Sequence, residues 1–263
     1  MLQDGLAVVS GSLVGFVLGL IGGGGSILAV PLLVYVVGVK SPHVAIGTSA
    51  IAVALSALSS LVGHARAGNV RWPCALVFTA SGIAGAGIGS TLGKHFDGQR
   101  LLMLFGVLMI VVAATMLRKR STDDARFVPL SAETARRLAP RLMAYGAGTG
   151  LLSGFFGIGG GFLVVPGLIA AVELPLLAAV GSSLVSVTAF GMTTAVNYAL
   201  SDLIDWRLVG MFVAGGILGS LFGGRVATKL AQQKQTLSLV FSGIVASVGF
   251  YVVLRGAFTL VQP

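Results

Sequence analysis

Apolar residues run along this chain in long, nearly uncharged segments separated by short polar stretches. The apolar segments cover about residues 5–38, 42–63, 73–93, 101–117, 142–172, 175–200, 208–224 and 236–254. Their lengths match the roughly 20 residues that cross a bilayer as a helix. The pattern predicts an all-α integral membrane protein with four segments in each half of the chain.

The second half of the chain repeats the first. Residues 15–31 return as residues 150–166, and glycines and a final proline recur in the same places. Three further matches follow in the same order: Gly47-Thr-Ser49 with Gly181-Ser-Ser183, Val70-Arg-Trp72 with Ile204-Asp-Trp206, and Gly82-Ile-Ala-Gly85 with Gly216-Ile-Leu-Gly219. Self-similarity over this length indicates an internal duplication. It predicts two homologous transmembrane repeats, over residues 1–117 and 142–263, joined by a linker over 118–141.

Glycines break the first apolar segment of each half. One continuous helix over residues 5–39 would be about 50 Å long, against a hydrocarbon core of about 30 Å. We expect helical arms around an unwound or re-entrant turn, with the arms at Leu6–Ile21 and Ile27–Val37, and at Leu151–Phe156 and Phe162–Val172. Because irregular backbone at membrane depth must lie inside protein or beside water, both turns are expected at the centre of the molecule.

The relative direction of the two repeats stays open. If all four segments of a half cross the membrane, the repeats are parallel, whereas a re-entrant first segment leaves three crossings and inverted repeats. Basic residues flank both ends of the third segment, Arg66 and Arg71 at one and Lys94 and Arg100 at the other. The excess of basic residues on the cytoplasmic side therefore does not decide the topology.

A glycine turn that leads into a helix has the chemistry of an anion site. The helix start offers free N–H groups and the positive end of the helix dipole, and broken segments at corresponding positions of two halves point to a transporter's binding site. The candidate substrate-binding residues are the turn glycines and nearby hydroxyls: Gly22, Gly23, Gly24, Gly25, Ser26, Thr48, Ser49, Gly157, Gly159, Gly160, Gly161, Ser182, Ser183 and Ser186. The alternative is that the turn glycines serve only close helix packing.

Other glycines recur at every fourth position. They are Gly11, Gly15, Gly19 and Gly23, then Gly85, Gly89 and Gly93, then Gly215, Gly219 and Gly223. Small residues at this spacing predict closely packed transmembrane helices. No dinucleotide-binding or Walker A pattern is present, so no cofactor is expected.

Polar residues near the end of the second segment of each half are candidates for gating or proton coupling. They are His64, Arg66, Asn69 and Asn197. An ionisable residue at the edge of a span is more often a headgroup anchor. The functional interpretation is that His64 or Arg66 lines the mouth of the cavity, where it attracts the anion or carries a proton. The position aligned with His64 holds Tyr198.

Composition excludes several other classes. Only 10% of the residues are charged, against about 25% in soluble domains. The net charge of +9 comes largely from residues 118–141, which suggests a cytoplasmic linker beside anionic lipid rather than nucleic-acid binding. All eight carboxylates lie in loops or at the chain extremities, so neither an aspartyl-type catalytic site nor a metal site is expected.

The repeated pattern resembles the TauE/SafE family, the sulfite exporter and toluene sulfonate uptake permease type membrane proteins. The resemblance rests on Gly19–Gly25 with Pro31, on Gly47-Thr-Ser49 and on Gly68-Asn-Val-Arg-Trp72, and it covers essentially the whole chain. One departure is the run of four glycines, Gly22–Gly25, where a form like Ile158–Gly161 is more usual. The resemblance implies a multi-pass secondary transporter of the cytoplasmic (inner) membrane. It further implies sulfite or sulfonates as substrates and coupling to an ion gradient.

The sequence therefore predicts a transporter that moves a small sulfur-containing anion by alternating access. The runner-up is a transporter or channel for a non-sulfur anion such as a carboxylate, and a third hypothesis is a structural membrane partner with no flux. The expected partners are the small anion, the lipid bilayer, a coupling proton and a second copy of the chain, with no nucleic acid. The glycine-rich faces that suggest a homodimer fit packing within one chain equally well.

Overall fold

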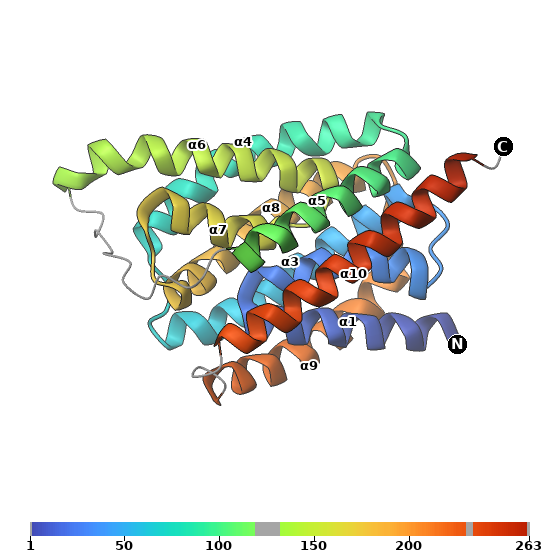
Figure 1. The fold of residues 1–263 in the computed structure, drawn as a ribbon, viewed down its shortest axis with the longest axis horizontal. Helices are drawn as coiled ribbons and strands as arrows, with labels where there is room; N and C mark the ends of the chain where they lie inside the picture. The colour runs from blue at the N-terminus through green and yellow to red at the C-terminus, as the bar shows by residue number, and fades with distance from the viewer. Residues whose placement is uncertain (1, 119–131, 230–233, 262–263) are drawn as a thin grey trace.

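The computed structural model describes residues 2–118, 132–229 and 234–261, and within these ranges it contains helices and no strand (Figure 1). The elements in chain order are α1 (Leu2–Ile21), η1 (Gly22–Leu28), α2 (Ala29–Pro31), η2 (Leu32–Val36), α3 (Pro42–Arg66), α4 (Trp72–His95), α5 (Gly98–Arg118), α6 (Ala132–Phe156), α7 (Gly161–Val172), α8 (Leu176–Ala199), α9 (Trp206–Lys229) and α10 (Lys234–Val261). The element η1 is a 3-10 helix and η2 is a π-helix. The all-α prediction is confirmed.

Six helices are long and apolar enough to cross a membrane, counted over the described ranges. These candidate spans are Gln3–Leu20, Pro42–Arg66, Trp72–His95, Gly98–Thr115, Leu177–Ala199 and Trp206–Val226. Three shorter apolar stretches accompany them, at Gly24–Val36, Gly161–Val172 and Ser242–Phe258. The chain is therefore a multi-pass membrane protein.

The helix boundaries differ from the sequence prediction at the linker. Helix α6 begins at Ala132, so residues 132–141, which we expected in the linker, form its first turns. This stretch is rich in alanine and arginine, which are strong helix formers, and despite Pro140 the helix continues into the apolar part of α6. The rest of the expected linker lies outside the described residues, apart from Arg118 at the end of α5.

The two halves of the chain exchange helices. Helix α1 packs along α9, and α6 packs along α4, so the first helix of each half lies against a helix of the other half. Across the centre, corresponding elements pair with one another: α3 with α8, α5 with α10, and η1 with α7. Figure 1 shows α4 beside α6 along one edge of the molecule and α1 beside α9 along another.

Glycines bring the exchanged helices together backbone to backbone. A Cβ atom at Gly15 of α1 would collide with the backbone of Gly216 in α9, and one at Gly150 of α6 would collide with the backbone of Gly82 in α4. Only hydrogen atoms fit at such positions. The predicted packing role is thus confirmed for α1, α4 and α9, and the glycine faces that suggested a homodimer are covered within the chain.

Corresponding helices of the two halves run in opposite directions. Gly47 near the start of α3 faces Tyr198 and Leu203 at the end of α8, whereas Gly191 within α8 faces Ala50 and Ala54 of α3. The α5–α10 pair is also antiparallel, because residues later in α5 contact glycines earlier in α10. Antiparallel pairs are typical of inverted repeats. The first helix, Gln3–Leu20, is nevertheless itself a candidate span, so the first half does not show the three crossings expected for that topology.

Candidate functional site

The glycine turn of the second half is an unwound connection between two helices. Helix α6 ends at Phe156, and α7 begins at Gly161 with Gly160 as its N-cap. Gly157, Gly159 and Gly160 have φ angles of 67°, 67° and 70°, a region that residues with a Cβ rarely adopt. The predicted turn between these two helical arms is therefore confirmed.

The four-glycine segment of the first half is helical, and here the prediction of an unwound turn is wrong. It forms the 3-10 helix η1 directly after α1. At Gly25 a Cβ would lie 2.5 Å from the backbone nitrogen of Leu18 and 2.8 Å from the carbonyl oxygen of Val14. Glycine here allows η1 to fold back tightly against α1. Its role is close backbone contact and not an unwound turn.

The two glycine segments meet inside the protein. The 3-10 helix η1 packs against α7. Gly24, Gly25 and Ser26 of the first segment are buried, and so are all residues of the turn at 157–161. The structure thus brings candidate residues of both halves together in the buried interior.

Two of the candidate hydroxyls bind loops of the opposite half. The amide of Asp205, just before α9, donates a hydrogen bond to Thr48 Oγ1 (3.1 Å), and the amide of Arg71, just before α4, donates one to Ser182 Oγ (2.9 Å). These bonds are at corresponding positions of the two halves. Thr48 and Ser182 therefore position the exchanged helices.

The other candidate hydroxyls also have partners within the protein. Ser49 donates to the carbonyl of Ile46 (2.9 Å), and Ser183 donates to that of Val180 (2.8 Å). Ser186 Oγ lies 2.7 Å from the hydroxyl oxygen of a buried α4 residue, Thr79. To bind a ligand as donors, Ser49 and Ser183 would first have to leave their own helix carbonyls.

Ser153 is a candidate that the sequence analysis did not include. It lies in the last turns of α6, it is 0% exposed, and its hydroxyl has no hydrogen-bond partner in the described part of the chain. A Cβ on Gly160 would lie 2.6 Å from both Cβ and Oγ of Ser153, so this side chain lies directly against the start of α7. A serine inside a helix carries no local signal for such a role.

The gating candidates at the end of α3 occupy different environments. The His64 ring contacts the backbone of Gly19 near the end of α1, and its Nδ1 atom is buried without a partner. Arg66 is exposed, and Asn69 is half-buried in the loop before α4, where its carbonyl packs against Gly181. Tyr198, which aligns with His64, is fully buried, and its hydroxyl has no partner among the described residues.

Asn197 is the centre of a polar cluster between α4 and α8. Lys94 Nζ donates to the carbonyl (3.0 Å) and the Oδ1 (2.7 Å) of Asn197 and to Ser201 Oγ (2.9 Å). Asn197 Nδ2 in turn donates to Ser90 Oγ (2.6 Å) and Thr91 Oγ1 (2.9 Å). Because α3 and α8 are antiparallel, this cluster and His64 lie at opposite ends of the molecule.

Replacing Asn197 by alanine is expected to destabilise the protein. The change removes the acceptor at Oδ1 and both donors, and each half-buried group left without a partner costs about 1–3 kcal/mol. We expect a clearly lower unfolding temperature of the purified protein. Ser201→Ala is the matched control, since it removes one hydrogen bond of the same lysine and should have a smaller effect. Equal stability of Asn197→Ala and the wild type would show that the cluster does not hold α4 against α8.

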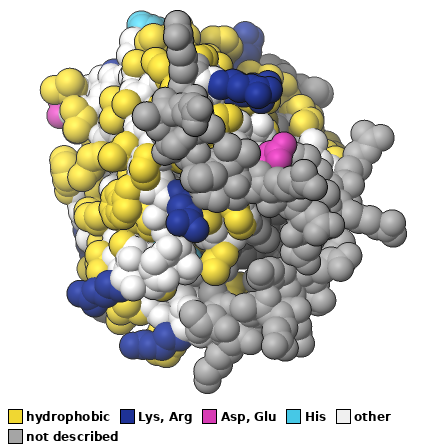
Figure 2. All heavy atoms as spheres, turned by 90° about the vertical axis from the view of Figure 1, so that its left-hand side faces the viewer, with side chains coloured by type: hydrophobic (Ala, Val, Ile, Leu, Met, Phe, Trp, Pro, Cys, Tyr) yellow, Lys and Arg dark blue, Asp and Glu magenta, His cyan; other side chains and the backbone are white. Residues whose placement is uncertain are grey.

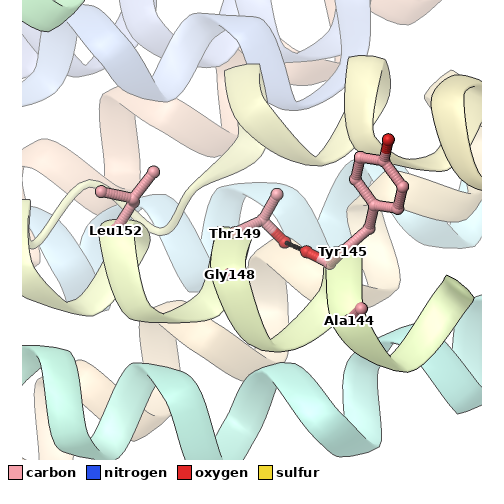
Figure 3. A pocket seen from close by; sticks show the side chains of 5 residues that line it. All are labelled: Ala144, Tyr145, Gly148, Thr149 and Leu152. Carbon is pink, nitrogen blue, oxygen red and sulfur yellow. Dashed lines mark hydrogen bonds between the residues drawn. The ribbon is translucent and has the colours of Figure 1, made fainter. Parts of the chain in front are cut away.

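The described hollows lie away from the glycine turns. One, of about 340 Å³, is on the outer face of α6 and is lined by Ala144, Tyr145, Gly148, Thr149 and Leu152 (Figure 3). In it the Thr149 hydroxyl donates to the carbonyl of Tyr145 (2.7 Å). A smaller one, of about 150 Å³, lies beside the Arg207–Asp4 ion pair near the start of α9. Neither is lined by a turn residue, and the turns themselves are closed off by packed side chains.

Comparisons with known proteins give one consistent result. The model of the protein family described as "Sulfite exporter TauE/SafE" matches residues 7–252. A "Probable membrane transporter protein" of Xylella fastidiosa (strain 9a5c) is 49% identical over 256 residues, 97% of either chain. "Probable membrane transporter protein YunE" of Bacillus subtilis (strain 168) is 27% identical over 271 residues, 97% of this chain and 98% of its own. No solved structure matches the chain.

Proposed function

We propose that this chain, which belongs to the sulfite exporter TauE/SafE family of membrane transporters, moves a small sulfur-containing anion, either sulfite or an organosulfonate. The family consists of transporters and not of enzymes. The observation that carries the proposal is the buried contact between the two glycine segments, where the start of α7 faces inward. Free amides and the positive end of a helix dipole at such a place suit an oxyanion.

Substrate binding is assigned to the glycine segments and the hydroxyls around them. The turn at 157–161 supplies backbone amides, and the segment Gly22–Ser26 closes the site from the other half. Thr48 and Ser182 each use the oxygen to accept a backbone hydrogen bond, so their own O–H groups remain available to a ligand if the loops move. Ser49, Ser183 and Ser186 would bind the substrate by giving up their present hydrogen-bond partners for the anion.

The antiparallel arrangement of corresponding helices supports alternating access as the mechanism. In transporters built from inverted repeats, one half rocks against the other around a site near the bilayer midplane. Here corresponding helices run antiparallel and the glycine segments meet between them. We assign gating to the ends of α3 and α8. His64 and Arg66 lie at the end of α3, Asn69 lies in the loop after it, and Asn197 lies at the end of α8. His64 is the candidate carrier of a coupling proton, because its Nδ1 atom is buried without a partner among the described residues.

We place the protein in the cytoplasmic membrane. The end on the left-hand side of Figure 1, which Figure 2 shows from the front, would face the cytoplasm. Figure 2 shows lysine and arginine side chains spread over one end face of the molecule among hydrophobic ones, with few acidic groups. Cytoplasmic ends of membrane proteins carry such an excess of basic residues. Trp72 and Trp206, exposed at the starts of α4 and α9, suit the membrane–water interface, where tryptophan is enriched.

Ligand-induced stabilisation tests the substrate class. The purified protein is unfolded by heat in the presence of sulfite, methanesulfonate, thiosulfate, sulfate or acetate. A ligand at about 100 times its dissociation constant adds about 2.7 kcal/mol to the stability, which raises the unfolding temperature measurably. We expect stabilisation by at least one sulfur oxyanion and none by acetate. Stabilisation by acetate alone would favour the carboxylate alternative, and stabilisation by no anion would contradict the proposal.

A further inference from the structure

The hydroxyl of Ser153 differs from most serine and threonine hydroxyls in the helices of this protein. Most of them, such as Ser49, Thr149 and Ser183, donate to a carbonyl three or four residues earlier in their own helix. Ser153 does not, although it is 0% exposed. Among the buried serine and threonine hydroxyls without a described partner, which also include Ser56, Ser60, Thr194 and Ser242, Ser153 is the one beside the start of α7. A buried hydroxyl without a partner is costly, so Ser153 requires a partner that the described residues do not provide.

The start of α7 lies directly beside this hydroxyl. A Cβ on the N-cap residue Gly160 would be 2.6 Å from Ser153 Oγ, and no side chain caps the helix. The first amides of an α-helix, here those of Gly161 and Phe162, have no partner within the helix. Ser153 and the start of α7, with these amides, therefore lie beside each other in the buried interior.

The surroundings of these donors are apolar and carry no charge. The turn glycines face Ile46, Val53, Val187 and Phe190. Over the described ranges, every buried polar side chain apart from tyrosine and cysteine is a serine or a threonine, and none is charged. Taking an ion out of water costs free energy that rises steeply with its charge. A few neutral donors at a helix start can offset that cost for a single negative charge, but no cation among the described residues lies here to help with a second one. Neutral donors in an apolar site therefore suit a singly charged anion far better than a doubly charged one.

We propose that Ser153 and the first amides of α7 bind a monoanionic sulfo group, such as a sulfonate or hydrogen sulfite, and that the site rejects dianions such as sulfate. The inference rests on the proposed function and adds to it the charge state of the substrate and the residue that recognises it. The first half offers no equivalent, because the residue aligned with Ser153 is Leu18 and the segment after it is the 3-10 helix η1. The sulfo group therefore binds to the second-half turn, and the apolar side chains contact its organic substituent.

Binding affinities at several pH values test this assignment. The probes are methanesulfonate, which is a monoanion throughout, sulfate, which is a dianion, and sulfite, which changes from hydrogen sulfite to the dianion as the pH rises. We expect methanesulfonate to bind with an affinity that does not change with pH and sulfate not to bind. The apparent affinity for sulfite should fall about tenfold per pH unit once the dianion dominates. Methanesulfonate is the control for protein groups that titrate in the same range.

Two serine variants separate recognition from stability. Ser153→Ala should weaken the binding of methanesulfonate and hydrogen sulfite about 10-fold to 100-fold, the usual loss for a hydrogen bond to a charged group. Ser242→Ala is the matched control and should bind like the wild type, because Ser242 is also fully buried without a described partner but lies in α10.

The outcomes distinguish this inference from the proposed function. If the wild type binds sulfur oxyanions but Ser153→Ala binds them equally well, or if sulfate binds as tightly as methanesulfonate, the inference is wrong while the proposed function stands. If the wild type binds none of the three probes, the proposed function fails, and the inference that rests on it fails with it.

Discussion

Replacing Gly159 by leucine is expected to reduce transport to background while the protein still inserts into the membrane. Gly159 has a φ of 67°, where a residue with a Cβ is strained by about 1–2 kcal/mol. A Cβ there would already lie 3.1 Å from Val53 Cγ1 and 3.6 Å from Val187 Cγ1, so the rest of the leucine side chain must push the turn out of place. Displaced amides at the start of α7 can no longer surround the anion.

Two companion variants give this test its controls. Gly159→Ala adds only the Cβ and should retain part of the activity, while Trp72→Phe changes an exposed residue at the start of α4 and should leave transport near the wild-type rate. Uptake into proteoliposomes is compared at equal amounts of inserted protein. Wild-type transport by correctly inserted Gly159→Leu would remove the second glycine turn from the substrate site.

Replacing Gly150 by leucine is expected to prevent correct folding. A Cβ at this position in α6 would collide with the backbone of Gly82 in α4. A backbone cannot move aside as a flexible side chain can, so the two helices would have to separate, at a cost above the roughly 1–3 kcal/mol of ordinary overpacking. We expect little monodisperse protein after extraction in detergent, as measured by size-exclusion chromatography.

Gly148 provides the matched control on the same helix. A Cβ at Gly148 would meet no atom within 4 Å, because this residue lines the open hollow on the outer face of α6 (Figure 3). Gly148→Leu should therefore give a folded yield close to the wild type. A similar loss of yield for both variants would show that leucine is harmful anywhere in α6, and it would contradict the account of close α4–α6 packing.

The sequence predicted a structural feature correctly where its residue pattern is compatible with only one local structure. Glycine at every fourth position, as in Gly11 and Gly15, permits close helix contact and little else, so that prediction is confirmed. The unwound turn before α7 was predicted because glycines break a segment too long for one span, and it too is found. The same reasoning failed for Gly22–Gly25, because glycine suits a 3-10 helix as well as an unwound turn, and the close approach of Gly25 to Leu18 selects the first.

The remaining features depend on contacts that no local pattern encodes. Thr48 and Ser182 were expected beside the substrate, and they hold loops of the opposite half because the halves exchange helices. Ser153 and Tyr198 were not predicted as site residues, since a buried hydroxyl without a partner can be recognised only in three dimensions. The alignment of Tyr198 with His64 was the one sequence signal that pointed to it.

Counterflow of radiolabelled sulfite into proteoliposomes is the decisive experiment on transport by alternating access. Vesicles containing the purified protein are loaded with unlabelled sulfite and diluted into a trace of labelled sulfite. A transporter that works by alternating access exchanges internal for external anion, so the label should accumulate transiently above its equilibrium level, and unlabelled methanesulfonate inside should support the same exchange. Label that only equilibrates, at a rate independent of internal substrate, would indicate a channel, and no uptake above that of empty vesicles would contradict transport of this anion.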